Sequence, residues 1–600
     1  MTEQTVLCAE REFILRVPEG ASAALCRVER QADAAGGVPA EYELTLKAAQ
    51  PVTGPVVLQW SCHMAGVLSY WSPTALRERG VPQWWHANVS HAELSLGAPL
   101  LAVIGQGRDN FCTAALSDAE RPLRMTFAVN DFEEKEHLDF CVYLFESESL
   151  AGEYTVRLRL DERAVPYEDA IADAVKWWEN FYPPEKPDAP SSELPLYSSW
   201  YNYHQHPEQA SLEKEMVLAA EMGFKALIID DGWSYDGNGP GDYRFCGDWK
   251  LAPSKFPDFG AFVEKVHRLG IKAAVWFPVP FVGHETADHA RFAGKYLYDA
   301  PQFSAAVLDP RYPEVRRYIT DAYTEMMRRY GVDGLKLDFL NAFHADDPAM
   351  LCTDKAPGAD CETVEQGVIR LLREIRIALT AIRPDCMIEF RQYYVGPAIT
   401  RHCNMLRVGD CAFDCITNRI GVVDLRLMGY DLAVHADMLL WAGDETAENC
   451  AVMLLNILFA VPQISVLLQR STPQQLAVLR RYVTYWTENR ALLLHGRLRA
   501  PHPECNYPLV SSENAEKRIA AAYAETLYRF DGKQTDLFNA ADVAGTVVEN
   551  GTDGAVTAVW QDCFGTLCGS RVLAAGECCR LPVPLGGMVV LTAGSRKKGT

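Results

Sequence analysis

The spacing of apolar residues divides the chain into three parts, and the first part reads as strands. Apolar and polar residues alternate in runs such as Tyr42–Lys47 and Tyr154–Leu160. This period of two is typical of half-buried antiparallel strands, and turn-forming clusters recur between the runs. We therefore predict a β-sandwich over residues 1–182. Its tryptophans fit either the core of the sandwich or a surface on which sugars stack; they include Trp60, Trp71, Trp84 and Trp85.

A proline-rich segment, residues 183–195, separates this part from the next. Prolines occur four times between Pro183 and Pro190. Proline at this density is incompatible with a helix and with a central strand, so the segment is expected to be an extended linker.

The pattern then changes to strands that alternate with helices. Three predicted helices end at a glycine that directly precedes an apolar strand: Gly223, Gly270 and Gly331. Glycine in the left-handed conformation is the usual way to turn a helix back into a parallel sheet. The predicted strands cover residues 196–203, 225–231, 271–276, 331–340, 387–391, 405–408 and 463–468, with helical patterns at 363–382 and 423–460.

About eight strand–helix units over roughly 300 residues match the size of a (β/α)8 barrel. A doubly wound open sheet is the alternative, but no Gly-x-Gly-x-x-Gly follows the first strand, so a dinucleotide cofactor is not expected. Short β runs return over residues 500–600. The predicted fold is therefore multidomain: a central (β/α)8 TIM barrel (196–495), an N-terminal β-sandwich and a small C-terminal β domain.

Composition narrows the classes of function. The net charge of −22 argues against a nucleic-acid partner, because phosphate binding needs a basic face. No apolar run reaches the ~18 residues of a membrane span, so no membrane partner is expected. The N-terminus lacks the pattern of a secretory signal, and the 18 cysteines include no Cys-x-x-Cys pair. We expect a cytoplasmic protein with reduced cysteines; a homo-oligomer is left open.

Charged and aromatic side chains gather at the carboxyl ends of the predicted barrel strands, where barrel active sites lie. Lys336 and Asp338 stand two apart on one strand and project to the same side, so the cation should keep the carboxylate ionised. An always-charged carboxylate suits a nucleophile or an electrostatic stabiliser better than a proton donor. Other candidates follow neighbouring strands: Trp200, Asp230, Asp231, Trp276, Arg407, Asp410 and Asp414.

Carboxylates and indole rings suit a neutral sugar, because carboxylates accept hydrogen bonds from hydroxyls and a sugar's C–H face packs on an aromatic ring. Two aspartates at separate strand ends also meet the requirement for glycoside hydrolysis. Two other classes stay open. A metal-dependent amidohydrolase could use His204 and His206 with His435 and Asp437. A carbohydrate-binding protein without catalysis could keep the fold alone.

Five short motifs then occur in a fixed order: Ser199–Tyr203, Ile229–Trp233, Gly247–Trp249, Lys272–Trp276 and Leu335–Asp338. This series resembles the melibiase-type α-galactosidases of glycoside hydrolase family thirty-six. The resemblance implies a retaining enzyme that cleaves terminal α-galactosides of a small oligosaccharide, without a metal or another cofactor.

The resemblance also implies roles for single residues. Asp338 would be the nucleophile and Lys336 would touch the sugar. Asp230 and Asp231 would hold the 4- and 6-hydroxyls, and Trp249 and Trp276 would wall the pocket. Trp200 and Arg407 complete the expected substrate-binding set.

The acid/base is expected at Asp410, three residues after Arg407, with Asp414 as the second choice. The family form that the motif resembles has one more residue between the Arg and the Asp. A neighbouring anion should raise the pKa of Asp410, and the two catalytic carboxyls should lie roughly 5–5.5 Å apart. An α-N-acetylgalactosaminide, a β-L-arabinopyranoside, or transfer of galactose to a second sugar stay open.

Overall fold

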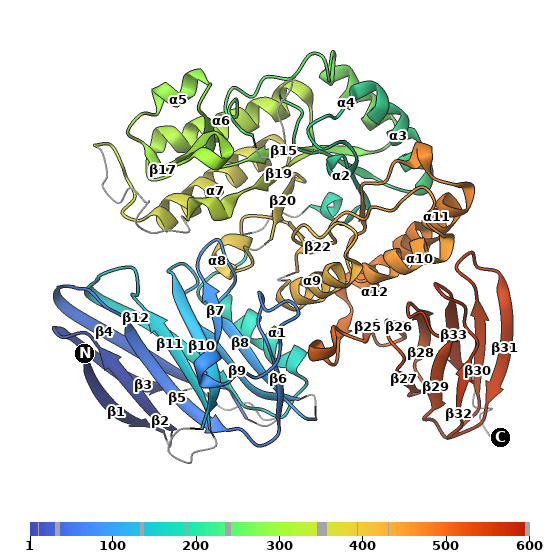
Figure 1. Cartoon of the computed structure of the whole chain (residues 1–600), viewed down its shortest axis with the longest axis horizontal. Helices are drawn as coiled ribbons and strands as arrows, with labels where there is room; N and C mark the ends of the chain where they lie inside the picture. The colour runs from blue at the N-terminus through green and yellow to red at the C-terminus, as the bar shows by residue number, and fades with distance from the viewer. Residues whose placement is uncertain are drawn as a thin grey trace.

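The structure is a computed structural model. It describes residues 1–9, 11–29, 37–107, 109–131, 137–185, 189–234, 242–344, 357–392, 394–429 and 431–594. Figure 1 shows the barrel at the top, with the blue N-terminal β-sandwich at the lower left and the red C-terminal β domain at the lower right. This is the predicted multidomain fold. Among the helices of the described residues, none is both long and apolar enough to cross a bilayer.

The N-terminal part consists of two six-stranded sheets. One sheet has the order β1 (Thr2–Cys8), β2 (Arg11–Val17), β5 (Val56–His63), β11 (His137–Leu144), β10 (Leu123–Asn130) and β7 (Asn88–Ala92). The other has the order β3 (Ala21–Val28), β4 (Ala40–Val52), β12 (Leu150–Asp161), β9 (Asn110–Leu116), β8 (Leu100–Gly105) and β6 (Val67–Trp71). The two runs with the clearest alternation, in β4 and β12, pair with each other, with Tyr42 opposite Leu158.

The four tryptophans of this region divide between the two expected environments. Trp60 and Trp71 are buried in apolar clusters, whereas Trp84 and Trp85 are 48% and 55% exposed. Trp60 stacks on Phe140, with ring centroids 5.1 Å apart. Burial in the core was therefore the right prediction for Trp60 and Trp71 and the wrong one for Trp84 and Trp85.

The barrel is an eight-stranded parallel sheet. Around the barrel the strands follow chain order: β13 (Leu196–Ser198), β14 (Ala226–Ile229), β15 (Lys272–Pro278), β19 (Gly334–Asp338), β20 (Met387–Arg391), β21 (Met405–Arg407), β22 (Ala433–His435) and β23 (Gln463–Ile464). β23 pairs with β13, and two parallel bridges, His435 to Val461 and Leu439 to Ile464, connect the β22 side. The sheet therefore closes on itself, which excludes the open-sheet alternative.

Two predicted elements of the barrel differ from the structure. The first strand ends at Ser198, and the next residues form a short helix, α2 (Trp200–Tyr203), because the amide of Tyr203 turns back to the carbonyl of Ser199. The region 423–460 is not helical throughout. The strand β22 lies between α9 (Cys415–Met428) and α10 (Ala447–Asn456).

The glycine-capped helices are present as predicted. α3 (Gln209–Met222), α4 (Phe259–Arg268) and α6 (Pro313–Tyr330) precede Gly223, Gly270 and Gly331, whose φ angles are 99°, 73° and 70°. Other helices are α1 (Tyr167–Trp178), α5 (Ala287–Arg291), α7 (Val364–Ile382), α8 (Pro397–Thr400), α11 (Pro473–Glu488) and α12 (Arg490–His495). A small antiparallel sheet, β16 (Phe281–Gly283), β18 (Ala305–Leu308) and β17 (Tyr296–Ala300), is inserted after β15.

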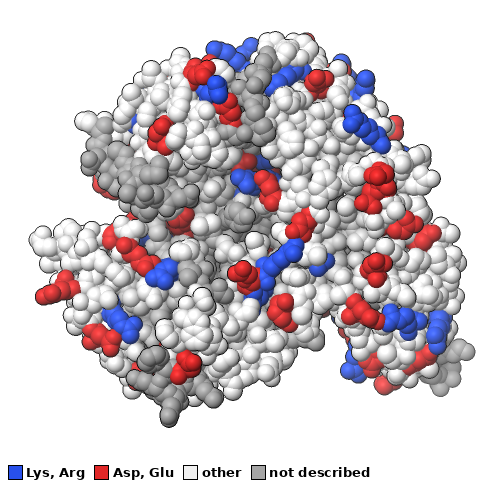
Figure 2. Space-filling view, in the orientation of Figure 1, with Lys and Arg blue, Asp and Glu red and all other residues white. Residues whose placement is uncertain are grey.

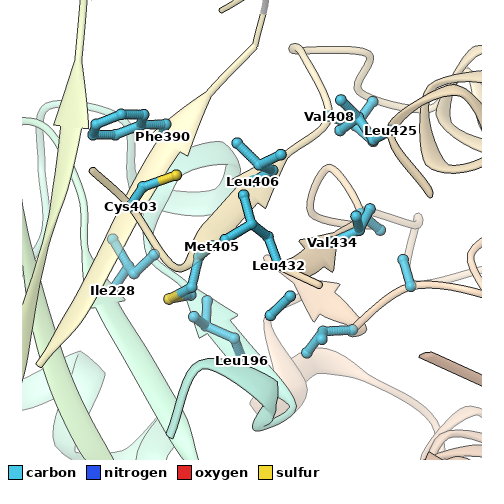
Figure 3. Close-up of a cluster of buried hydrophobic side chains, with 14 of the residues drawn as sticks. Leu196, Ile228, Phe390, Cys403, Met405, Leu406, Val408, Leu425, Leu432 and Val434 are labelled. Carbon is cyan, nitrogen blue, oxygen red and sulfur yellow. The ribbon is translucent and has the colours of Figure 1, made fainter. Parts of the chain in front are cut away.

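Apolar side chains from the barrel strands and α9 form the core beneath the strand ends. Figure 3 shows Leu196, Ile228, Met405 and Leu406 in one cluster, and each is at most 1% exposed. A core packed this tightly fixes the strands, and with them the side chains at their ends.

The C-terminal part has a seven-stranded and a three-stranded sheet. The first has the order β24 (Arg497–Arg499), β25 (Leu509–Glu513), β26 (Lys517–Ala522), β28 (Gln534–Asn539), β33 (Met588–Ala593), β30 (Val556–Gln561) and β31 (Leu567–Leu573). The second has the order β27 (Leu527–Phe530), β29 (Thr546–Asn550) and β32 (Cys578–Leu581).

One buried carboxylate joins all three parts. Asp424 of α9 pairs with Arg79 of the sandwich at 2.6 Å and accepts a hydrogen bond from Trp71 at 2.8 Å. Tyr507 of the C-terminal part donates to the same carboxylate at 2.5 Å. The Arg79 and Asp424 side chains are at most 4% exposed, so each charge depends on the other.

We expect Arg79→Met to lower the free energy of unfolding by about 3–5 kcal/mol, because it leaves the Asp424 charge buried without its cation. Urea unfolding followed by tryptophan fluorescence measures the loss. The matched control is Arg77→Met, which removes an exposed ion pair with Asp414 and should cost at most about 1 kcal/mol. Equal losses in the two variants would contradict this role for Asp424.

Candidate active site

Asp338 is the last residue of β19, at the carboxyl end of the barrel, and its carboxylate is enclosed by donors. Trp276 Nε1 donates to Oδ2 at 3.0 Å, and the Phe339 amide donates to Oδ1 at 2.7 Å. Arg391 Nε also donates to Oδ1, at 2.7 Å. Burial alone would raise the pKa of Asp338, but the charges of Arg391 and Lys336 hold it well below its usual range. Asp338 is thus a buried, permanently ionised carboxylate.

Arg391 is the link to a second carboxylate. It ends β20, the strand next to β19, and its Nη1 lies 3.7 Å from Asp410 Oδ2. Its guanidinium also lies over the ring of Phe339, 5.6 Å from the centroid. Asp338 and Asp410, 72 residues apart in the sequence, therefore meet at one guanidinium. Sequence reasoning missed this residue, although its place at a strand end, beside the strand that ends in Asp338, is a usable signal.

Asp410 lies in the loop after β21 and is half exposed, so it is open to solvent. Arg407 Nη2 donates to its Oδ1 at 2.9 Å. Burial raises the pKa of Asp410, but the charges of Arg407, Arg391 and Lys336 outweigh it, and the pKa lies below its usual range. The raised pKa predicted from the sequence is therefore wrong: cations, not a neighbouring anion, dominate around this carboxylate.

Asp414, the second choice for the acid/base, is engaged elsewhere. Its Oδ1 accepts the amide of Thr417 at 3.0 Å, which makes it the N-cap of α9. It also pairs with Arg77 of the sandwich at 2.7 Å. Both contacts fit a structural role at the start of the helix, so the geometry favours Asp410.

Lys336 and Asp230 form a buried ion pair inside the barrel mouth. Lys336 Nζ lies 2.8 and 3.1 Å from the two Asp230 oxygens, and neither side chain is more than 3% exposed. Ser198 also donates to Asp230 at 3.2 Å. Asp230 was expected to bind sugar hydroxyls, and Lys336 was expected to touch the sugar. Both contacts would compete with the ion pair that the two side chains already make.

Asp231 has a different environment from its neighbour. Gln205 and Tyr243 donate to its Oδ2, at 2.5 and 3.3 Å. Burial and the adjacent charge of Asp230 raise the pKa of Asp231 to about 7. A carboxyl that titrates near neutral pH can accept or donate a hydrogen bond to a sugar hydroxyl.

Arg407 is 1% exposed and connects Asp410 to Asp437, with which it makes a short ion pair. Asp437 also accepts hydrogen bonds from Tyr201 and from the amide of Cys411, both at 2.7 Å. Arg407 therefore pairs with Asp410 from the protein interior and is not exposed to a substrate. Asp437 was not assigned to this site from the sequence, because the strand that precedes it was taken as helix.

The three tryptophans predicted for the site lie in different surroundings. Trp276 reaches Asp338, whereas Trp249 packs at 4.9 Å on Phe277, the next residue of the same strand. Successive strand residues point to opposite faces, so Trp249 lies on the helix side of β15. Its prediction as a wall of the same pocket is therefore wrong. Trp200, on α2, contacts the ring of His204 at 4.9 Å, and no contact recorded for the described residues links it to Asp338.

The histidines of the amidohydrolase alternative are not assembled. Both ring nitrogens of His435 are engaged, Nε2 with the Ser192 carbonyl at 2.6 Å and Nδ1 with Gln463 at 3.0 Å. His204 ends α2 with its ring on Trp200. Within the described ranges, no three His, Cys, Asp or Glu side chains are grouped as metal ligands.

Charges of both signs are interspersed where the sandwich meets the barrel (Figure 2). Beside Asp410 a small cavity of about 50 Å³ is lined from the sandwich by Pro73 and Leu76 and from the barrel by Val395 and Val408, among others. Asp410 therefore borders a small cavity that is formed by two parts of the chain and has both apolar and polar walls.

Comparisons with known proteins show which proteins this chain is similar to. The melibiase family model matches residues 193–375, which include β13 to β19 and Asp338. "Probable alpha-galactosidase C" of Aspergillus flavus is 29% identical over 171 residues, 26% of this chain and 23% of that protein. Alpha-galactosidase Mel36A of Lactobacillus acidophilus is 25% identical over 149 residues, 24% of this chain and 20% of that protein. The match thus spans about a quarter of each protein.

Solved structures extend the likeness in fold to the whole chain. The galactosidase domain of the alpha-galactosidase-sucrose kinase AgaSK has a TM-score of 0.62 at 12% identity, covering 97% of this chain and 82% of that one. The alpha-galactosidase AgaA of Geobacillus stearothermophilus, solved with raffinose, has a TM-score of 0.62 at 12% identity, covering 93% and 79%. Residues 193–375 thus match the melibiase family model, in a chain whose fold is similar to that of the alpha-galactosidases of glycoside hydrolase family thirty-six.

Proposed function

We propose that the protein is a retaining glycoside hydrolase that removes terminal α-galactosides from small oligosaccharides. The observation that carries the proposal is the contact of Asp338 and Asp410 with one guanidinium at the carboxyl end of the barrel. Two carboxylates that flank one sugar are what glycoside hydrolysis requires. The choice of an α-galactoside as the substrate rests on the names of the relatives.

In the first step, an Asp338 oxygen attacks the anomeric carbon, and the bond to the leaving oxygen breaks as Asp410, as the acid, gives its proton to that oxygen. The low pKa of Asp338 keeps it ionised for this attack. Trp276 and Arg391 fix the carboxylate in place, because each donates to a different oxygen.

In the second step, water replaces Asp338 at the anomeric carbon, and Asp410 accepts the proton of that water. Asp410 suits this role because Arg407 and Arg391 keep it ionised and because it is half exposed. Arg407 does not contact the sugar in this mechanism but positions Asp410.

Asp231 is the side chain that we assign to the sugar hydroxyls. It lies beside the Lys336–Asp230 pair, and a pKa of about 7 lets its carboxyl donate as well as accept near neutral pH. An α-N-acetylgalactosaminide or β-L-arabinopyranoside as substrate, and transfer to a sugar acceptor, stay alternatives within this mechanism. A protein that only binds carbohydrate would show no turnover.

We expect Asp338→Ala to lower kcat/KM on nitrophenyl α-galactoside by on the order of 10⁴-fold, because the nucleophile is removed. Azide should restore part of the activity and give a β-galactosyl azide, since the small anion attacks from the vacated side. Release of nitrophenol and NMR of the product measure both.

The matched control is Asp414→Ala, which removes a helix cap. It should cost about 1 kcal/mol of stability and leave kcat/KM within a few-fold of wild type. Wild-type turnover by Asp338→Ala, or its loss in Asp414→Ala alone, would contradict the assignment.

The raised pKa of Asp231 predicts a pH-dependent stability. The folded protein holds a proton that the unfolded chain has released between its ordinary pKa near 4 and about 7. The contribution is therefore fully present at acid pH and is lost as pH rises through 7. Between pH 5 and pH 8 the Tm of wild type should fall more than that of Asp231→Asn, measured by scanning calorimetry. The same change in Tm for both proteins would contradict the raised pKa.

A further inference from the structure

A broad groove lies on the N-terminal sandwich. Its volume is about 1190 Å³, and every described residue that lines it lies between Ala9 and Glu162. Small-molecule ligands ordinarily occupy clefts of roughly 300–1,000 Å³, so the groove is large enough to hold an oligosaccharide. Because the described part of its lining contains no barrel residue, the groove is separate from Asp338 and Asp410.

One wall of the groove is the outward face of the first sheet. Gln59, Ser61 and Asp139 alternate along β5 and β11 with side chains buried in the sandwich core, so they point to the opposite face. Ser61 lies opposite Asp139 in the sheet and donates to its Oδ1 at 2.6 Å. Asn130 of the neighbouring strand β10 donates to its Oδ2 at 2.6 Å. Hydroxyl, amide and carboxylate groups thus form a row across three strands, and such groups can both donate to and accept from sugar hydroxyls.

An exposed indole lies next to this row. Trp84 lines the groove, is 48% exposed and begins the short 3-10 helix η1 (Trp84–His86). A backbone bridge from Gln83 to β10 places η1 beside that strand. Trp84 Nε1 donates to Asp131 Oδ1 at 2.9 Å, and the ring of Trp85 packs on it edge to face, with centroids 5.6 Å apart. A ring that is held in place and open to solvent offers a flat surface on which the C–H face of a sugar can pack.

The charges in the groove are balanced, which favours a neutral ligand. The described lining contains three arginines and three carboxylates: Arg11, Arg16, Arg27, Glu12, Asp139 and Glu162. Arg11 pairs with Glu162 at 2.5 Å. Arg16 contacts Glu3 at 2.7 Å and Gln59 at 2.8 Å. An anionic ligand would find no excess of positive charge here, whereas hydroxyl groups can add to the hydrogen bonds already present.

We propose that this groove is a second sugar-binding site, which holds a neutral oligosaccharide by stacking on Trp84 and by hydrogen bonds to Ser61, Asn130 and Asp139. The site binds sugar and carries out no chemistry. It gives the exposed Trp84 the role of a sugar-stacking surface, outside the barrel and independent of the hydrolysis proposed for Asp338.

The test is isothermal titration calorimetry of stachyose, a neutral oligosaccharide, on the Asp338→Ala protein, which does not consume it. Two sites per chain are expected, one at the barrel and one in the groove. Adding Trp84→Ala should weaken one of them about tenfold, the scale of losing one aromatic contact. Adding Ser61→Ala should weaken the same site a few-fold, because it removes one hydrogen-bonding group.

The matched control is Phe564→Ala, which removes an aromatic ring that is 39% exposed in the C-terminal part and should leave both sites unchanged. Circular dichroism verifies that each variant folds. Trp84→Ala in the otherwise wild-type chain should keep kcat/KM on nitrophenyl α-galactoside. A loss of kcat/KM as large as the loss of binding would place Trp84 in an active site and overturn the inference.

A titration in which no stachyose site responds to Trp84→Ala would also overturn it. Binding of an oligogalacturonide, whose sugars carry carboxylates, as tightly as stachyose would contradict the neutral ligand. Absence of turnover by wild type on every galactoside would instead refute the proposed function, and the response of stachyose binding to Trp84→Ala would still decide the role of the groove.

Discussion

The site depends on one constraint: charges at the mouth of a closed parallel barrel are enclosed and must be paired. Closure brings the carboxyl ends of β14, β19, β20 and β21 to the same end. Lys336 pairs with Asp230, Arg391 with Asp338, and Arg407 with Asp437 and Asp410. Removing one partner would leave an uncompensated buried charge, so each pair fixes the position of the next.

The same pairing explains why two buried aspartates, Asp338 and Asp231, have pKa values that shift in opposite directions. Asp338 is buried, and its low pKa comes from the cations and donors that contact it. Asp231 is also buried, and burial and the adjacent charge of Asp230 act in the same direction, so its pKa rises to about 7. Local charge, rather than burial alone, therefore decides which carboxyl is always ionised and which titrates near neutral pH.

Much of the fold could be predicted from the sequence, because glycine at Gly223, Gly270 and Gly331 marks where helices return to strands. β22 could not, since its three residues lie in an apolar stretch that also fits a helix. Because this strand was missed, Asp437 was not assigned to the site from the sequence. Domain limits, a cytoplasmic location and a homo-oligomer stay predictions of the sequence.

Site residues could be predicted from the sequence where their position at the end of their own strand is enough to place them in the site. Asp338, Lys336 and Trp276 stand at strand ends in the sequence, and the structure places them together. Arg391 and the low pKa of Asp410 depend on which strands are neighbours, so they required the three-dimensional arrangement. Trp249 failed for a similar reason: its loop packs on the helix side of β15.

The most direct test of the account is the identity of the residue that becomes covalently attached to the sugar. A 2-fluoro-galactosyl fluoride traps the glycosyl-enzyme of a retaining galactosidase, because the fluorine at C2 slows both steps while the fluoride leaving group keeps the first step faster than the second. Peptide mass spectrometry of the inactivated protein should then place the sugar on Asp338. A label on Asp410, or on any other residue, would contradict the central claim.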